Sequence, residues 1–198
     1  MKSVLISIQP KWVEKIVSEI GMTDKPFYEK SIEIRKTRPS IKTPFKCYIY
    51  ETKNTKDIHG FTILGRYRLG KVIGEFVCDK IEEFSIPYPA YFGEVNRHTR
   101  ELIENACLNL LEAHLYLGKK NGYAWHISDL VIYDKPKALS EFTTYCKEQD
   151  KDDPNCDDCI YFEPCRGVDF DESDCHCNGH KPITRPPQSW CYVESLEV

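Results

Sequence analysis

The sequence predicts an α+β domain in which two helices accompany about six short strands. Three observations support this fold class. Most apolar segments alternate with polar residues, two segments have the apolar spacing of a helix, and glycine interrupts a long strand pattern. Strands twisted by glycine fit a small closed or nearly closed β-barrel, although periodicity alone leaves a β-sandwich open. With 198 residues, of which 41% are hydrophobic, the chain can bury one core, and we expect residues 1–198 to form a single domain.

The N-terminal part is expected to run from a strand into a helix. Residues 4–8 form a short apolar strand. Pro10 suits the first turn of the following helix, because the N–H group that it lacks would have no helical partner there. Gly21 is the expected end of this helix. Its buried face is predicted to consist of Trp12, Val13, Ile16, Val17 and Ile20.

Two further strands are predicted in the middle of the chain. Residues 45–50 alternate, and Cys47 has no Cys or His neighbour in the sequence, so we expect it in the core. Residues 71–81 are the longest strand candidate, in which Gly74 indicates a bulge or a bend. Cys78 shares the apolar face of this strand and is also expected in the core.

A second helix and two strands complete the predicted fold. Thr99 is the expected N-cap of a helix over residues 99–117, which ends before a glycine. Residues 124–133 are predicted to form a strand, and residues 189–194 are predicted to form the last one.

The most unusual strand candidate is residues 30–39, KSIEIRKTRP, which place one acid among four bases. On an alternating strand, Glu33 and Arg35 project from one face, roughly 7 Å apart. Lys36 and Arg38 continue the positive charge along the segment. A solvated strand edge protected by charge is the structural interpretation of this pattern. A charged binding surface is the functional one.

Lys30, Glu33 and Arg35 form the motif K-x-x-E-x-R after a predicted helix, and this arrangement resembles the hallmark of the ASCH domain, a branch of the PUA-like superfamily. The family motif is G-x-K-x-x-E-x-R, and Tyr28 stands here in the place of its glycine. The other segments that resemble bacterial and phage ASCH proteins are residues 70–81, 122–142 and 186–196. The resemblance implies a PUA-like small β-barrel with two main helices and a cleft beside the motif.

ASCH domains are regarded as RNA-binding modules, so the resemblance implies that the chain binds RNA or another single-stranded nucleic acid. Lysine and arginine suit this role, because they donate charge-assisted hydrogen bonds to phosphate. Glu33 would instead orient Lys30 or Arg35, or accept a hydrogen bond from the exocyclic amine of a base. Tyr28 and Trp125 are candidate stacking faces, although Trp125 suits the core equally well. The predicted nucleic-acid-binding residues are Lys30, Glu33, Arg35, Lys36, Arg38, Trp125 and His126.

Two other functions are compatible with the sequence. Some ASCH proteins are amidohydrolases of acetylated cytidine, so the resemblance makes a hydrolase of a nucleoside or RNA the main alternative. Their threonine nucleophile lies three residues after the motif lysine, where this chain has Glu33, and Ser31 would be the substitute hydroxyl. For cleavage of RNA, Lys30, Glu33 and His126 are the candidate acids and bases. A protein-interaction adaptor is the third class.

A cysteine-rich insertion is predicted over residues 143–181, where the ASCH resemblance is interrupted. Seven of the ten cysteines follow Phe142. Four thiolates fit a tetrahedral Zn²⁺, and so acidic a segment cannot fold by apolar burial alone, so we expect a structural zinc ion. The expected zinc ligands are Cys156, Cys159, Cys165 and Cys175. The alternative ligands are Cys146, Cys177, His180 and Cys191. An iron–sulfur cluster and a disordered acidic loop are the other interpretations.

The distribution of charge separates the insertion from the rest of the chain. Residues 147–179 contain three bases and eleven acids, whereas the whole chain has a net charge of −4. The remainder therefore sums to +4, and residues 1–46, with ten bases and five acids, are mildly basic. The apolar run at the N-terminal end is too short for a signal peptide, and no later segment is apolar enough for a membrane span. We therefore expect a cytoplasmic protein, in which the cysteines are reduced.

Overall fold

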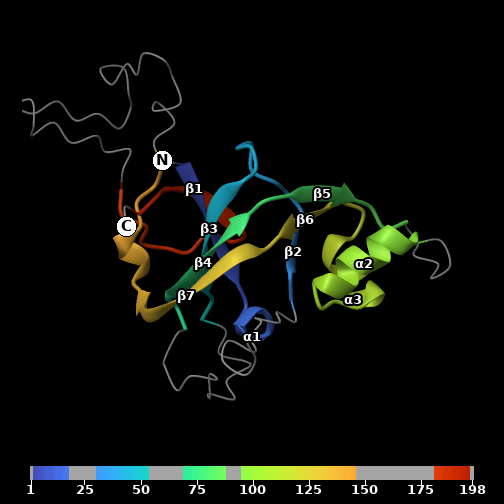
Figure 1. The fold of residues 1–198 in the computed structure, drawn as a ribbon, viewed down its shortest axis with the longest axis horizontal. Helices are drawn as coiled ribbons and strands as arrows, with labels where there is room; N and C mark the ends of the chain where they lie inside the picture. Colours follow the sequence, from blue (N-terminus) through green and yellow to red (C-terminus); the bar gives the residue numbers. More distant parts are fainter. Residues whose placement is uncertain (1, 18–29, 54–68, 88–94, 146–180, 197–198) are drawn as a thin grey trace, which may run out of the picture.

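Two β-sheets and the helices that pack on them make up the structure, a computed structural model that describes residues 2–17, 30–53, 69–87, 95–145 and 181–196 (Figure 1). The strands are β1 Lys2–Ile8, β2 Ile32–Arg35, β3 Phe45–Glu51, β4 Val72–Cys78, β5 Ile81–Phe84, β6 Gly122–His126, β7 Ser128–Lys137 and β8 Trp190–Glu194. The helices are α1 Pro10–Val17, α2 Arg97–Asn105, α3 Leu110–Leu117 and a short 3-10 helix, η2 Leu139–Glu141. The α+β class is therefore confirmed.

The strand pairing corrects the expectation of a closed barrel. The larger sheet has the order β7-β4-β3-β1-β8 and the smaller sheet has the order β2-β6-β5, and no ladder joins the two among the described strands. The strand predicted over 71–81 ends at Cys78 as β4, and Ile81 already begins β5. The one predicted over 124–133 divides into β6 and β7. In each case the chain leaves one sheet and enters the other, because each half has different pairing partners.

Gly74 lies at an irregularity of the sheet, as its place in the sequence predicts. The register of β4 against β7 shifts between Val72 and Gly74. A Cβ atom at Gly74 would collide with the backbone oxygen of Val131. Glycine therefore allows the two strands to approach closely at this shift.

The single helix predicted over 99–117 is two helices, so the described part of the chain has three main helices in place of the expected two. Asn109 starts α3 with a capping box, in which its side chain accepts from the backbone N–H of Glu112 and the Glu112 carboxylate accepts from the backbone N–H of Asn109. Cys107 has a φ of 55°, a left-handed conformation that no helix continues through. The N-cap of α2 is Asn96, and Thr99 supplies the backbone N–H that Asn96 accepts from.

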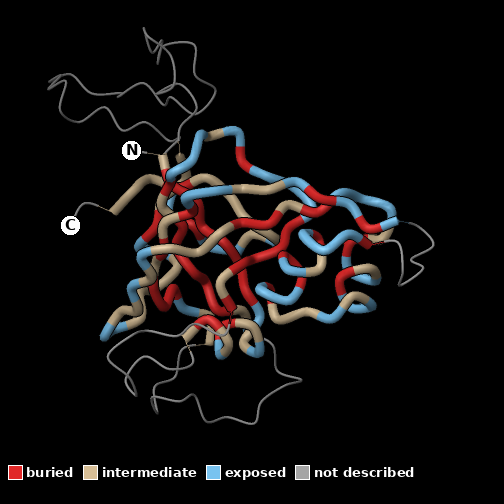
Figure 2. The backbone as a smooth tube through the Cα atoms, turned by 45° about the vertical axis from the view of Figure 1, so that its right-hand side comes forward, coloured by how far each residue is buried: buried red, intermediate tan, exposed pale blue. Residues whose placement is uncertain are grey.

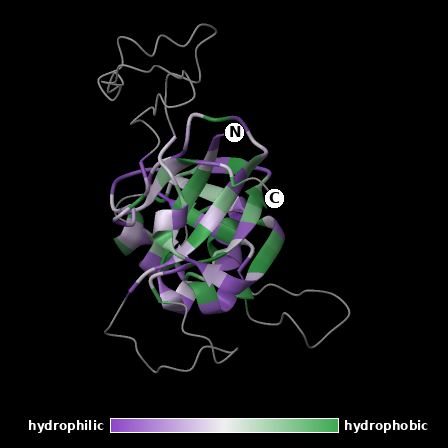
Figure 3. Ribbon diagram, turned by 90° about the vertical axis from the view of Figure 1, so that its left-hand side faces the viewer, coloured by the Kyte–Doolittle hydropathy of each residue, from purple (hydrophilic) through white to green (hydrophobic). Residues whose placement is uncertain are grey.

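Three apolar clusters hold the layers together. The first lies between the five-stranded sheet, α1 and β6, and it contains Cys47 and Cys78, whose predicted core positions are confirmed. The second joins the three-stranded sheet to α2 and α3, and the third covers the other face of the five-stranded sheet. Buried positions concentrate in β1, β2, β3, β4 and β6 (Figure 2). Apolar and polar residues alternate in bands along the strands and helices (Figure 3). Both faces of β2 are covered, since all four of its residues are buried.

The two sides of the predicted insertion meet beside β8. The backbone N–H of Thr144 donates to the oxygen of Lys181 over 2.9 Å, and the N–H of Lys181 donates to the Thr144 hydroxyl over 3.1 Å. Phe142 likewise accepts from the N–H of Ile183 over 2.8 Å. The chain thus leaves and re-enters the described structure at one place. No helix in the described ranges is long and apolar enough to cross a membrane.

Candidate binding cleft

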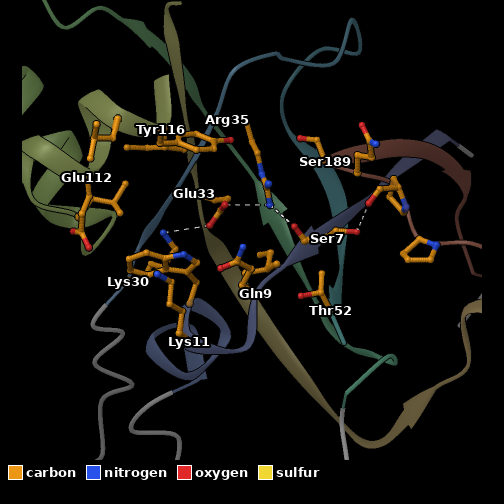
Figure 4. Close-up of a pocket in the computed structure, with 18 residues that line it drawn as sticks. Ser7, Gln9, Lys11, Lys30, Glu33, Arg35, Thr52, Glu112, Tyr116 and Ser189 are labelled. Carbon is orange, nitrogen blue, oxygen red and sulfur yellow. Dashed lines mark hydrogen bonds and ion pairs between the residues drawn. The ribbon is translucent and has the colours of Figure 1, made fainter. Parts of the chain in front are cut away.

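An open cleft of about 770 Å³ lies where β1, α1, β2 and α3 meet residues 186–189 (Figure 4). Its lining includes Lys30, Glu33 and Arg35, so the structure brings the three motif residues together on one surface. Glu33 and Arg35 share one face of β2, as predicted, because Ile32 and Ile34 occupy the other face against the helices.

The three charged side chains of the motif form a buried ion-pair array. Lys30 Nζ lies 3.2 Å from Glu33 Oε2, and Arg35 Nη2 lies 3.1 Å from Glu33 Oε1. The exposed fractions are 2% for Lys30, 6% for Glu33 and 8% for Arg35. The interpretation of this strand as a solvated charged edge is therefore wrong. Burying three charges is costly, and here each charge has an opposite partner at close range.

Two backbone carbonyl groups complete the array. Lys30 Nζ donates to the oxygen of Ala106 over 2.9 Å, at the C-terminal end of α2, where the helix dipole favours a cation. Arg35 Nη2 donates to the oxygen of Ser7 over 2.6 Å. Elements that lie far apart in the sequence therefore fix the direction of both cations.

Ser7 also fixes the wall formed by residues 186–189. Its backbone N–H donates to the oxygen of Ser189 over 2.9 Å, and its hydroxyl donates to the oxygen of Pro187 over 2.7 Å. Every hydrogen-bonding group of Ser7 is thus engaged, and the wall is held in place next to Arg35 (Figure 4).

Two aromatic side chains of the described residues line the cleft, Trp12 from α1 and Tyr116 from α3. Each lies beside a lysine: Lys11 Nζ is 4.6 Å from the centre of the Trp12 ring, and Lys36 Nζ is 4.8 Å from that of Tyr116. Burial raises the pKa of the Tyr116 hydroxyl above its ordinary value of 10.0, so this group is neutral at physiological pH. Sequence reasoning gave Trp12 only a place on a buried helix face and did not single out Tyr116.

The structure distributes the other predicted residues over different surroundings. Lys36 and Arg38 are exposed, and Lys36 reaches the cleft through its contact with Tyr116. Trp125 is fully buried in the core, with ring centres of Phe45 and Trp190 each 5.9 Å away, and so offers no stacking face. Tyr28 lies outside the described residues, and Ser31 is not part of the cleft lining.

His126 lies on the opposite face of its sheet from Glu33. Between β2 and β6, Trp125 pairs with Glu33 and His126 pairs with Ile32. Because consecutive residues of a strand point to opposite faces, Trp125 lies on the face of Glu33 and His126 lies on the face of Ile32. His126 Nε2 instead contacts Glu82 Oε1 at 2.8 Å, and His98 Nε2 contacts the other oxygen of Glu82 at 3.1 Å. His126 and Glu33 are therefore not arranged to act on one substrate.

Replacing Glu82 by glutamine should change how stability depends on pH. Burial opposes ionisation of Glu82, but hydrogen bonds from Lys80 and His126 outweigh it and lower the pKa of the carboxyl below its ordinary value of 4.5. Such a group stabilises the fold above its unfolded pKa, and this contribution disappears as the pH falls through the lower folded pKa. The unfolding free energy of wild type should therefore fall more steeply than that of Glu82→Gln below about pH 4.5.

Urea unfolding at a series of pH values would measure this difference. The matched control is Glu83→Gln, which removes an exposed carboxylate from the next position of β5. The control should follow the wild-type pH dependence, and parallel curves for wild type and Glu82→Gln would contradict the role of Glu82.

The predicted zinc ligands Cys156, Cys159, Cys165 and Cys175 all lie outside the described residues. Within the described ranges, no group of His, Cys, Asp and Glu side chains is able to hold a metal ion. The alternative ligand Cys191 packs beside the third apolar cluster. Burial raises the pKa of its thiol to about 11.

The zinc site stays a prediction, and metal analysis tests it. Protein purified under reducing conditions without added metal should contain about one Zn²⁺ per chain, because four thiolates complete one tetrahedral site. Cys159→Ser should lose this zinc. The control Cys191→Ser should keep it, and an absence of zinc and iron from the wild-type protein would exclude both metal interpretations.

The fold resembles solved structures of an ASCH protein from Zymomonas mobilis. Its wild-type structure has 17% sequence identity and a TM-score of 0.47, covering 77% of this chain and 82% of that chain. A serine-to-alanine variant has 18% identity and a TM-score of 0.47, with 77% and 83% covered. A tyrosine-to-phenylalanine variant has 19% identity and a TM-score of 0.46, with 70% and 77% covered.

Comparison of the sequence itself found no matching protein-family model and no matching curated protein. At these identities the likeness to the solved structures concerns the fold. The solved structures that this fold resembles are those of ASCH proteins.

Proposed function

We propose that the cleft binds one unpaired base of a single-stranded nucleic acid, with RNA as the expected ligand. The observation that carries this proposal is that one open cleft of about 770 Å³ combines two aromatic side chains, Trp12 and Tyr116, with the buried ion-pair array of the motif. Aromatic side chains stack on any base, and buried polar groups read its edge. The cleft thus combines the two components of single-strand recognition.

The buried and the exposed cations of the cleft have different surroundings, which favour different roles in ligand binding. Lys30 and Arg35 already contact Glu33 and backbone oxygens, so little of their charge is available to a phosphate. Lys11 and Lys36 are exposed and lie next to the aromatic side chains. We therefore assign phosphate contacts to these two lysines and to the exposed Arg38, and base contacts to the buried array.

This division predicts the salt dependence of binding. Three phosphate contacts at about 0.7 each give a slope of roughly −2 for the logarithm of affinity against the logarithm of salt concentration. Lys36→Ala should flatten the slope by about 0.7 and weaken binding to all sequences alike. Fluorescence anisotropy with labelled single-stranded RNA at several salt concentrations measures both quantities.

The control variant is Lys135→Ala, which removes an exposed lysine from β7, away from the cleft lining. It should leave the slope unchanged. If Lys36→Ala and Lys135→Ala give the same slope as wild type, Lys36 makes no phosphate contact. If wild type does not bind RNA or single-stranded DNA at low salt, the proposed function is wrong.

A further inference from the structure

The carboxylate of Glu33 has acceptor capacity that its neighbours leave unused. Oε1 lies 3.1 Å from Arg35 Nη2. Oε2 lies 3.2 Å from Lys30 Nζ, close enough for attraction, but it accepts no hydrogen bond. A carboxylate group can only accept hydrogen bonds. Glu33 therefore needs a donor, and it lines the cleft from which a donor can come.

Arg35 presents the complementary group beside it. Its Nη2 atom serves both Ser7 and Glu33, whereas its buried Nε atom has no hydrogen-bond partner. A guanidinium can only donate, so this atom needs an acceptor. Glu33 and Arg35 share one face of β2 and both line the cleft. The unused acceptor and the unused donor therefore belong to two side chains that contact each other through Oε1 and Nη2. Leaving such buried groups unpaired is unfavourable.

From this pair we propose that the cleft selects a base with an exocyclic amino group over uracil or thymine. The inference rests on the proposed function and names the ligand class within it. An amino group would donate to Glu33, and the adjacent acceptor of the same base would receive the hydrogen bond of Arg35. Cytosine, adenine and guanine each carry an amino group, and each also has an acceptor on the same edge.

Uracil is the unfavourable case for electrostatic reasons. Its one edge donor, the ring N–H, lies between two carbonyl oxygens, which the negative carboxylate of Glu33 repels. Bringing uracil to Glu33 would thus place like partial charges together in a poorly solvated site, where polar mismatches are most costly. If cytosine makes a hydrogen bond to a charged group that uracil cannot make, the affinity for cytosine should be higher by roughly tenfold to hundredfold.

The test compares pyrimidines, which differ least in stacking. Anisotropy titrations of the full wild-type chain would use labelled oligocytidine, oligouridine and an oligonucleotide of 2-pyrimidinone, which is cytosine with hydrogen in place of the amino group. Oligocytidine should bind at least about tenfold more tightly than both others. Equal binding of all three would overturn the selection of an amino group but leave the proposed function standing. Binding of none would overturn the proposed function itself.

Glu33→Gln provides a second measurement. Its carboxamide both donates and accepts, so the ratio between oligocytidine and oligouridine affinities should move toward one. The matched control is Glu112→Gln, which also lines the cleft and can keep its place in the capping box of α3. This control should preserve the ratio. A folded Glu33→Gln protein with an undiminished preference would contradict the inference, and if this variant does not fold, the wild-type comparison decides alone.

Discussion

Glu33→Ala should destabilise the protein by about 3–5 kcal/mol, the cost that follows when one partner of a buried ion pair is removed. Glu33 is the only anion in contact with Lys30 and Arg35 in the described part of the array, and the side chains of all three are at most 10% exposed. Without it, two cations would remain buried close together with only backbone oxygens as partners. Urea unfolding at neutral pH measures the loss.

A surface ion pair provides the control for this prediction. Arg97 and Glu101 contact each other at 2.8 Å one turn apart on α2, with side chains 92% and 48% exposed. Glu101→Ala should cost less than about 1 kcal/mol, because water and salt screen such pairs. Equal losses from the two substitutions would mean that the Glu33 array is solvated in the folded protein, contrary to the structure.

Alanine substitutions of two tryptophans should separate the core from the cleft. Trp125 is fully buried, so Trp125→Ala should lower the unfolding free energy by about 3–5 kcal/mol. Trp12 is partly buried and lines the cleft, so Trp12→Ala should lower stability less. It should instead weaken binding of single-stranded RNA by about 1–3 kcal/mol, the usual range for one stacked base.

Thermal or urea unfolding and RNA titration of both variants measure these effects. Trp125→Phe serves as the conservative control, since it keeps an aromatic ring in the core and should restore part of the stability. RNA affinity that is unchanged in a folded Trp12→Ala protein would remove α1 from the proposed base site.

The sequence determined the local arrangement of the motif strand. Period-two alternation placed Ile32 and Ile34 on one face and Glu33 and Arg35 on the other, and β2 has this arrangement. The same kind of local pattern correctly put Cys47 and Cys78 in the core. Local patterns succeed here because side-chain direction along a strand depends only on neighbouring residues.

The divisions of the longer elements depended on contacts that no local pattern records. The apolar spacing over residues 99–117 is continuous enough for one helix, but Asn109 and Glu112 form a capping box that begins α3. Likewise, the strand pattern over 124–133 does not show that its halves pair with different sheets. A pairing partner is chosen by tertiary structure, so the point where a strand changes sheets is not visible in its own sequence.

Only the tertiary structure decided whether each face of β2 is buried or exposed to solvent. Alternation alone allowed Glu33 and Arg35 to face either solvent or the interior. The structure places them inside, where Arg35 donates to Ser7 and Lys30 donates to Ala106. These partners are 28 and 76 residues away along the chain. The sequence by itself thus determined which charged side chains lie on the same face of β2. Contacts between distant segments decided that these side chains are buried at a cleft, because burial depends on what the rest of the chain packs against them.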